Sequence, residues 1–415
     1  MFARQFVGCV FAVALFPFSA RGQELPSPLT IHALLDVVRQ RNPQLAEQEH
    51  LAQAAAARPS AAGQPDDPMV SVEWWQQPVN FQNVPIMISA RQSLPWPGKL
   101  RARRQISERQ ATIARDQVSE IAIRLEAEAV RVFLDLALSE DRLSVNHRMR
   151  GLLTAMVATT DARYRVGRAA QAEVLRAQAE LLTLENDRFD LERARDESMV
   201  RLNALLNRST DAALPPICPE GDAITLPSIE QAIERALSKR PDIRLAQDVV
   251  FEAEARVALA RLENRPELAV WAGYMINIRG SDNFTLGAST TLPVFSSRRR
   301  SSQVLAEESE VRAQKAALEA ARRRVEQEVR IAFLRLETSQ RHERLHADKL
   351  IPLAELALKS AETAYQNDRI NFLVVLDAAR MLRDHHLNHA QYRIETQRRR
   401  VDLQLALGGR LEVTQ

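Results

Sequence analysis

The sequence predicts a membrane protein of the α+β class, built from two tandem repeats that each combine one β-hairpin with long helices. Three observations predict it. Matching residues recur in order along the two halves of the chain, apolar residues alternate along two stretches in each half, and long charged stretches with helical periodicity follow. Internal repeats on this scale are typical of duplicated structural units.

The first 22 residues predict a secretory signal peptide. Arg4 gives a basic start, Phe6 to Phe18 form an apolar core, and small residues precede the expected cut before Gln23. That apolar core is too short to span a bilayer well. A buried N-terminal helix is the alternative interpretation.

The composition excludes several function classes. Without Arg4 and Arg21, 54 basic residues remain against 53 acidic ones, so the basic pI gives no argument for a nucleic-acid partner. Only Cys218 remains after the signal segment, which excludes an internal disulfide and a dithiol mechanism. Sparse glycine and proline with 26% charged residues favour long helices.

The two halves match at a nearly constant offset. Leu94 and Leu292, each followed by proline, are 198 positions apart, and Tyr164 and Tyr365 are 201 apart. We therefore expect a first repeat over residues 23–207, a linker rich in proline, aspartate and threonine over 208–226, a second repeat over 227–409, and a short tail over 410–415.

Each repeat opens with a short amphipathic helix and continues with a predicted β-hairpin, over about residues 68–95 and 267–293. Apolar residues occupy every second position along both arms of each hairpin, which is typical of strands with one buried face. The alternating apolar residues are Val70, Val72, Trp74, Ile86, Ile88 and Ala90 in the first repeat, and Leu268, Val270, Ala272, Tyr274, Ile276, Phe284, Leu286 and Ala288 in the second.

All four tryptophans lie in or beside these hairpins: Trp74, Trp75, Trp96 and Trp271. Tryptophan concentrates where the apolar band of a membrane barrel meets the polar interface. We therefore expect them to be barrel-interface aromatics, with a soluble sheet that buries its indoles as the alternative.

The segment SLPWPGKL, Ser93 to Leu100, predicts the point where strand becomes helix. Pro95 and Pro97 cannot continue a strand ladder, and Gly98 allows the turn from which Lys99 starts a helix. Pro293 marks the corresponding junction of the second repeat.

Long helices are expected over about 98–207 and 297–408. In the first repeat, Val174, Ala177, Leu181 and Leu184 follow the three- and four-residue spacing of a coiled-coil seam. Gly151 matches Pro352 at an offset of 201, which predicts a kink or helix end at that level.

Two turns reverse the direction of the chain within these long stretches. They are expected near Tyr164 and Gly167 in the first repeat, and near Tyr365 and Asp368 in the second. Gly167 suits a left-handed helix end, and Asp368 is a poorer residue for the same conformation.

This organisation resembles the TolC family of outer-membrane efflux channels over nearly the whole chain after the signal segment. LPWPGKL is similar to the heavy-metal branch, with its CzcC and CusC types. The resemblance implies a homotrimer in the outer membrane of a Gram-negative bacterium. Each protomer would supply four strands to a twelve-stranded barrel, which a periplasmic α-helical coiled-coil tube continues. Four strands cannot close a barrel alone, and open edges are not tolerated in lipid.

The resemblance also implies a function. The chain would be a passive duct without enzymatic activity or cofactor, served by a periplasmic adaptor that docks at the two turns and by an inner-membrane pump of the RND type. Heavy-metal cations such as Co, Zn, Cd, Cu or Ag are the first expected cargo. A channel for organic compounds or for type I protein secretion is one alternative. A soluble periplasmic coiled-coil scaffold or adaptor is a second alternative, from a different class of protein.

The family's gate at the tip uses two aspartates three positions apart on the inner helix. The matching positions here are Val374 and Asp377, so only one of the two acids is present. We expect Asp377 to act at a gate, with a simple ion pair to Arg380 as the alternative.

His385 and His389 are weak metal candidates. Their i,i+4 spacing puts both imidazoles on one helix face, as it does for His342 and His346. Two ligands make an incomplete zinc site, and His385 matches Leu184 of the seam, so packing is the favoured interpretation. The sequence contains no GxSxG, HExxH or phosphate-binding glycine loop that predicts catalysis.

Overall fold

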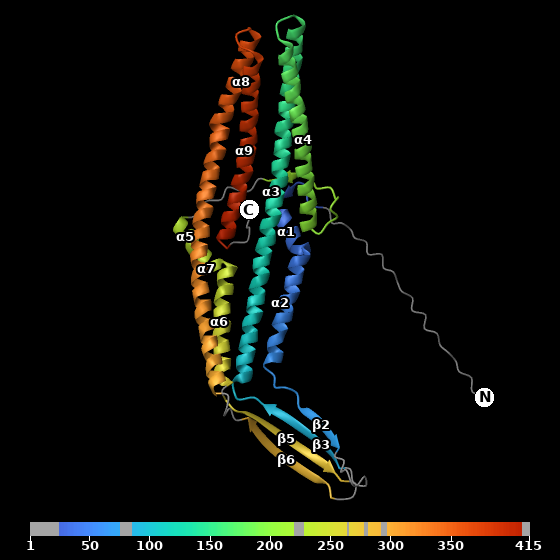
Figure 1. Cartoon of the computed structure of the whole chain (residues 1–415), viewed down its shortest axis with the longest axis vertical. Helices are drawn as coiled ribbons and strands as arrows, with labels where there is room; N and C mark the ends of the chain where they lie inside the picture. Colours follow the sequence, from blue (N-terminus) through green and yellow to red (C-terminus); the bar gives the residue numbers. More distant parts are fainter. Residues whose placement is uncertain are drawn as a thin grey trace, which may run out of the picture.

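The computed structural model of the chain describes residues 25–74, 85–219, 228–263, 265–277, 281–291 and 297–408. The predicted signal peptide and the tail over 410–415 lie outside these residues. The molecule is elongated, with a β-sheet at one end and two helical hairpins at the other (Figure 1). No helix in the described part of the chain is long and apolar enough to cross a membrane.

The same order of elements occurs in both halves: two short helices, two strands, a very long helical stretch, a turn and a return helix. In the first half they are α1 (Ile31–Arg41), α2 (Pro43–Ala62), β2 (Met69–Trp74), β3 (Ile86–Leu94), α3 (Lys99–Arg165) and α4 (Gln171–Leu205). In the second half they are α5 (Ile229–Lys239), α6 (Pro241–Leu262), β5 (Glu267–Ile276), β6 (Asn283–Thr291), α7 (Ser297–Leu345), the π-helix η1 (His346–Leu350), α8 (Ile351–Gln366) and α9 (Phe372–Ala406).

The two halves differ where a break was expected. Helix α3 runs through Gly151 without ending, so the predicted helix end is wrong for the first half. A single glycine costs an α-helix only about 1 kcal/mol, which the packing of a helix this long can offset. In the second half, π-helix η1 interrupts the run just before Pro352. Proline lacks the N–H that a helix interior needs, so a change of helix geometry there is expected.

Each return helix is joined end to end with a short helix of its own repeat. Asn42 caps α2 and its side-chain amide donates to the carbonyl of Leu205 at the end of α4, at 3.1 Å. Arg240 precedes α6 and donates to the carbonyl of Ala406 at the end of α9, at 3.4 Å. These bonds satisfy carbonyls that a helix end leaves without intrahelical partners.

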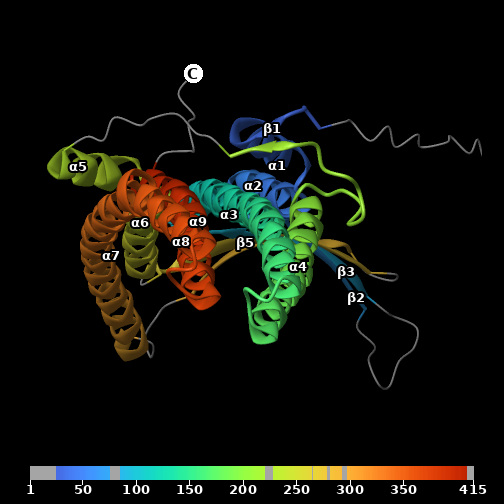
Figure 2. The same cartoon turned by 90° about the horizontal axis from the view of Figure 1, so that it is seen from above.

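Short elements form a middle layer beside the places where α4 meets α2 and α9 meets α6. Part of the predicted linker is ordered there, because β4 (Ile217–Cys218) pairs in parallel with β1 (Leu29–Thr30). Seen from above, α1, α5 and β1 lie on one side of the row of long helices (Figure 2). The sequence did not predict β1 and β4, since two-residue strands carry no periodic signal.

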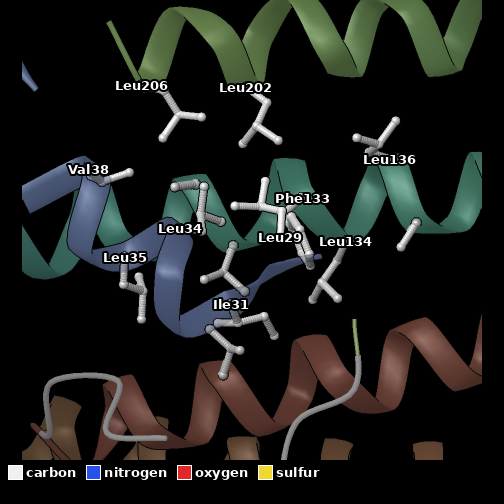
Figure 3. Packing of buried hydrophobic residues seen from close by; sticks show 14 of the residues in the cluster. Leu29, Ile31, Leu34, Leu35, Val38, Phe133, Leu134, Leu136, Leu202 and Leu206 are labelled. Atoms are coloured by element: carbon white, nitrogen blue, oxygen red, sulfur yellow. The ribbon is translucent and has the colours of Figure 1, made fainter. Parts of the chain in front are cut away.

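The core of the middle layer joins α1 to α3 and α4. Phe133 and Leu134 of α3 are fully buried, and Leu34 of α1 and Leu202 of α4 close over them (Figure 3). Burying such side chains contributes about 1.5–3 kcal/mol each. This core packs the short helix α1 against the long helices α3 and α4 and against α9.

Candidate functional site

The four-stranded sheet has one continuous apolar face. Its strand order is β2-β3-β5-β6, and every neighbouring pair is antiparallel. The register aligns apolar residues in rows across all four strands: Val70, Ala90, Ala272 and Leu286 in one row, and Val72, Ile88, Tyr274 and Phe284 in the next. Leu286 is 75% exposed and Phe284 69% exposed in the single chain. A contiguous apolar face of this kind needs lipid or another protein to cover it.

The opposite face of the sheet is more polar, although Met69, Met87, Trp271 and Met275 also lie on it. One row consists of Ser71, Ser89, Gly273 and Thr285, in which the hydroxyl oxygens of Ser71 and Ser89 lie 2.8 Å apart. Arg91 projects from this face as well, because it lies two residues from Ser89 on the same strand. The strands therefore alternate apolar and polar in the pattern of a membrane barrel with a wet interior.

Both outer strands of the described sheet have only one neighbour. β2 pairs with β3 alone, and β6 pairs with β5 alone. In lipid, the free N–H and C=O groups of such edges must be paired by other strands. The sheet in one chain is therefore incomplete as a membrane structure.

The tryptophans divide between different environments. Trp74 lies on the apolar face and is 72% exposed, which fits contact with lipid. Trp96 lies beyond the end of β3, and the guanidinium of Arg265 lies 5.9 Å from its ring centroid. Trp75 lies outside the described residues.

Trp271 does not lie on the apolar face. The register pairs it with Arg91 on one side and Gly287 on the other, in a row of the polar face. Successive side chains of a strand point to opposite faces, and the apolar positions of β5 are the even-numbered ones. The expectation that Trp271 marks a lipid interface is corrected accordingly, and it lies toward the barrel interior.

Gly287 provides the space for this tryptophan. A Cβ atom at position 287 would lie 2.6 Å from the Trp271 ring, closer than side chains approach. We expect Gly287→Val to displace the indole and to destabilise the β5–β6 hairpin by about 1–3 kcal/mol. The unfolding midpoint of purified protein measures this, with Ala288→Val on the opposite face as the matched control. Equal midpoints for the two variants would contradict the assigned position of Trp271.

The junction between strand and helix includes an ion pair between a buried lysine and a half-exposed glutamate. Residues 95–97, which contain both predicted prolines, follow β3, and Gly98 precedes α3 with φ +97°. Lys99 is 3% exposed, and its Nζ lies 2.7 Å from a carboxylate oxygen of Glu267, the first residue of β5. The start of the long helix is thereby tied to the second hairpin. Pro293 lies outside the described residues.

The two turns at the far end of the molecule have the same backbone conformation. Gly167 has φ +73° and Asp368 has φ +56°, and the N–H of the residue after each donates to the carbonyl five residues back, from Arg168 to Arg163 and from Arg369 to Ala364. This bonding closes a helix with a left-handed residue. Glycine takes that conformation without cost and aspartate does so less readily, as the sequence indicates.

Arg163 connects the two turns. Its guanidinium forms an ion pair with Asp368 and lies 4.5 Å from the centroid of the Tyr365 ring. The hydroxyl of Tyr365 lies 3.1 Å from a carboxylate oxygen of Glu173 at the start of α4, to which it donates. The α3/α4 hairpin and the α8/α9 hairpin are thus joined at their tips by polar contacts, which also include a bond from Arg163 to the carbonyl of Gln366 at 3.3 Å.

A second connection, which we call the clasp, joins the same hairpins further from the tip. It consists of Glu180 on α4 with Arg380 and Arg383 on α9, at 2.5 and 3.1 Å. Glu180 is 6% exposed, and hydrogen bonds from Arg380, with additional attraction from Arg383, lower the pKa of its carboxyl. The sequence contains a signal for it, because Glu180 is an acid between seam residues Ala177 and Leu184. The interpretation of the seam overlooked it.

The comparison with known families identifies the architecture. The outer membrane efflux protein family matches residues 34–208 and 232–409, which are the two halves described above. The chain belongs to this family. The TolC-type recognition is confirmed at this level, and with it the α+β fold of barrel strands and coiled-coil helices.

Individual relatives agree with this assignment. The chain is 25% identical over 337 residues to the pyoverdine export outer membrane protein OpmQ of Pseudomonas putida, covering 78% of this chain and 70% of that protein. A crystal structure of CusC superposes with a TM-score of 0.81 at 16% identity, covering 91% and 92% of the two chains. That of VceC from Vibrio cholerae superposes with a TM-score of 0.78 at 18% identity, covering 92% and 97%.

Membership of the efflux family places the chain in the outer membrane of a Gram-negative bacterium, with its helices extending into the periplasm. The family consists of transport channels rather than enzymes. Its members are typically trimers that work with a periplasmic adaptor and an inner-membrane pump. The soluble scaffold considered from the sequence is therefore excluded.

The clasp predicts how acid acts on the efflux channel. A carboxyl whose pKa is lowered on folding stabilises the folded state above its unfolded pKa of about 4.3. That stability is lost as the pH falls through the lower, folded value. We expect a loss of about 1 kcal/mol between roughly pH 5 and pH 3, since Arg380 is partly exposed. Unfolding midpoints against pH test this, because Glu180→Gln should flatten that part of the profile.

Asp377 lies one helical turn from the clasp. Its carboxylate lies 3.6 Å from Arg380 and its side chain is 61% exposed, so the ion-pair alternative is present in the structure. Val374, at the other gate position of the family, is 47% exposed. If Asp377 acts at a gate, its carboxylate does so while it is in contact with Arg380 of the clasp.

The predicted metal pair of His385 and His389 does not form a complete site. Among the residues that the structure describes, no group of three or more histidines, cysteines, aspartates or glutamates could hold a metal ion. His385 faces His346 across the helices instead, with ring centroids 5.5 Å apart.

Proposed function

We propose that this chain is the passive outer-membrane duct of a tripartite efflux system, acting as a homotrimer. The observation that carries the proposal is the two-faced sheet with two open edges, mounted on helices that end in two joined hairpins. Three copies of four strands give twelve, which is enough to close a barrel with a channel. Closure would pair both edges of every copy and put the apolar face in lipid.

The tip turns are the proposed docking surface for the periplasmic adaptor. Tyr164, Gly167 and Asp368 are accessible at the end of the hairpins furthest from the sheet, whereas Tyr365 is buried beneath them. An inner-membrane pump of the RND type would deliver cargo through that adaptor. Cross-linking from Val166, which is 69% exposed, to the adaptor in intact cells tests the assignment.

For the cargo, we propose heavy-metal cations such as Co, Zn, Cd, Cu or Ag first, on the basis of the LPWPGKL junction. An organic cargo is the second candidate, because the relative OpmQ is named for pyoverdine export. Deletion of the gene tests both. Increased sensitivity to these metals would support the first candidate, whereas unchanged metal tolerance with loss of organic export would support the second.

The proposed gate can be tested at Asp377. Three copies around a threefold axis would put three carboxylates near the pore, where cations bind between like charges. We expect Asp377→Asn to weaken the block of conductance by divalent cations in reconstituted channels. Asp384→Asn is the matched control, since Asp384 is also an exposed carboxylate beside an arginine of the clasp. An unchanged cation block in the Asp377 variant would remove the gate role.

A further inference from the structure

Histidines concentrate at one level of the helical region. The chain has eight, and five of them lie on α7, η1 and α9 close to where the π-helix begins: His342, His346, His385, His386 and His389. In Figure 1 this level is the change from α7 to α8. π-Helical turns are rare and occur frequently at functional sites. The duct and its docking surface use none of these imidazoles.

The rings of this histidine cluster pack directly against one another. His346, the first residue of η1, faces His385 of α9, with ring centroids 5.5 Å apart. The ring of Tyr392 closes the other side, with its centroid 5.2 Å from that of His346, and it stacks on His342 at 4.8 Å. His346 is only 7% exposed. The contact between η1 and α9 therefore includes two imidazoles, a group that takes up a proton near neutral pH.

A proton added to either facing ring would have no acceptor. Within the described part of the chain, the Nδ1 atoms of His346 and His385 are buried without a hydrogen-bond partner. A protonated imidazole carries an N–H on both nitrogens, so each Nδ1 would become a buried donor with nothing to bond. A buried charged donor without a partner is strongly disfavoured. The packed arrangement therefore favours the neutral form of both rings.

The groups around His346 favour the same neutral form. Burial is the main cause that lowers the pKa of His346, followed by the neighbouring rings of His385 and His389 on α9 and His342 on α7. Among the described residues, no carboxylate contributes to this shift. Positive charge on one ring of the cluster therefore makes protonation of the next ring harder.

The adjoining helices α3 and α8 contribute one charge of each sign, and both act on His386. Burial lowers the pKa of His386 most, the guanidinium of Arg148 on α3 lowers it further, and the carboxylate of Glu355 on α8 raises it. The shift of this pKa remains downward. Every helix packed against the cluster is thus accounted for, and together their groups oppose its protonation.

We propose that the histidine cluster is a pH-sensitive latch between η1 and α9. At neutral pH the uncharged rings pack together and hold the α7-to-α8 stretch against α9. In acid the rings become imidazolium groups, which repel one another and need water, so η1 separates from α9.

The pH range of the latch follows from the direction of the shift. Because the pKa of His346 is lower in the folded protein than in the open chain, the latch has its full stability above about pH 6.5. That stability is lost as the pH falls from there towards the folded value. The clasp responds only below about pH 5, where carboxylates begin to take up protons. His385 follows Arg383 of the clasp by two residues, so opening of the latch loosens the helix that carries the clasp.

The test is hydrogen exchange of the full-length protein, purified in detergent, at pH 7.5 and pH 5.5. After correction for the pH dependence of intrinsic exchange, we expect protection of the amides in η1 and over residues 382–394 to fall at pH 5.5. The fall should be up to about tenfold for each ring that stays neutral in the closed form, because pH 5.5 is about one unit below the ordinary pKa of histidine. The latch is a property of helices within one chain, so this readout does not depend on whether the channel conducts.

His385→Asn, at a half-buried position, removes one titrating ring and should keep most of its protection at pH 5.5. His346→Asn is a second variant, and each variant is compared with its own protection at pH 7.5, which also shows that it is folded. His50→Asn is the matched control, because His50 is an exposed histidine of α2, and it should respond to acid as the wild type does.

Two results would overturn the latch. One is equal protection of η1 and α9 in the wild type at both pH values. The other is a loss of protection in the His385 and His346 variants as large as that in His50→Asn. Glu180→Gln should still respond at pH 5.5, and an acid response that disappears in this variant would belong to the clasp instead.

Discussion

Replacing Ile88 by lysine is expected to prevent assembly of the channel in the outer membrane. Ile88 lies between Val72 and Tyr274 in a central row of the apolar face and is 42% exposed in the single chain. A lysine facing lipid near the bilayer midplane costs about 2–4 kcal/mol. The proposed trimer would contain three copies, so the total cost is comparable to the whole stability of an ordinary domain.

The neighbouring residue provides the matched control. Ser89 follows Ile88 on the same strand, so its side chain points to the opposite face of the sheet. Its neighbours in the register there are Ser71 and Gly273. Ser89→Lys should assemble, because its ammonium group reaches the wet interior. The measurement is the fraction of heat-modifiable oligomer in outer-membrane fractions on unboiled gels. If Ile88→Lys assembles as well as Ser89→Lys, the apolar face does not contact lipid and the proposed barrel is wrong.

The features that the sequence predicted are those that repeat. Alternation over residues 70–74, 86–90, 268–276 and 284–288 gave the strands, and the same alternation, applied to Trp271, already indicates its polar face. Trp271 occupies an odd-numbered position of β5, whereas the residues of the apolar face occupy the even-numbered positions. The turns were predictable because Gly167 and Asp368 are residue types that often end helices, and they lie at the same offset of 201 positions as Tyr164 and Tyr365.

Contacts between distant helices could not be predicted in the same way. Arg163 and Asp368 are 205 positions apart, and nothing in a charged helical surface distinguishes the arginine that meets this aspartate from its many neighbours. His346 and His385 are similar, since each pair of histidines indicated only its own helix face. Such pairs depend on how the helices pack against one another, within a hairpin and between the two hairpins.

Removing the clasp is expected to loosen the tip and to increase conductance. The buried carboxylate of Glu180 forms ion pairs with Arg380 and Arg383 of the other hairpin. In Glu180→Ala these arginines keep exposed partners, Asp377 and Asp384, so the protein should still fold. We expect a loss of about 1–3 kcal/mol from the association of the hairpins, because a desolvated ion pair with partly exposed partners is broken.

Glu185→Ala separates this effect from a general loss of charge. Glu185 lies five residues further along α4, but its partners are Arg150 of α3 and Arg188 of α4, so it acts within one hairpin. Single-channel conductance in planar bilayers should increase several-fold for Glu180→Ala and stay near the wild-type value for Glu185→Ala. Equal conductance in the two variants would mean that the clasp does not control the opening. An increase for Glu180→Ala alone would locate the resistance of the channel at the tip, because the clasp is far from the sheet and the substitution leaves the barrel unchanged.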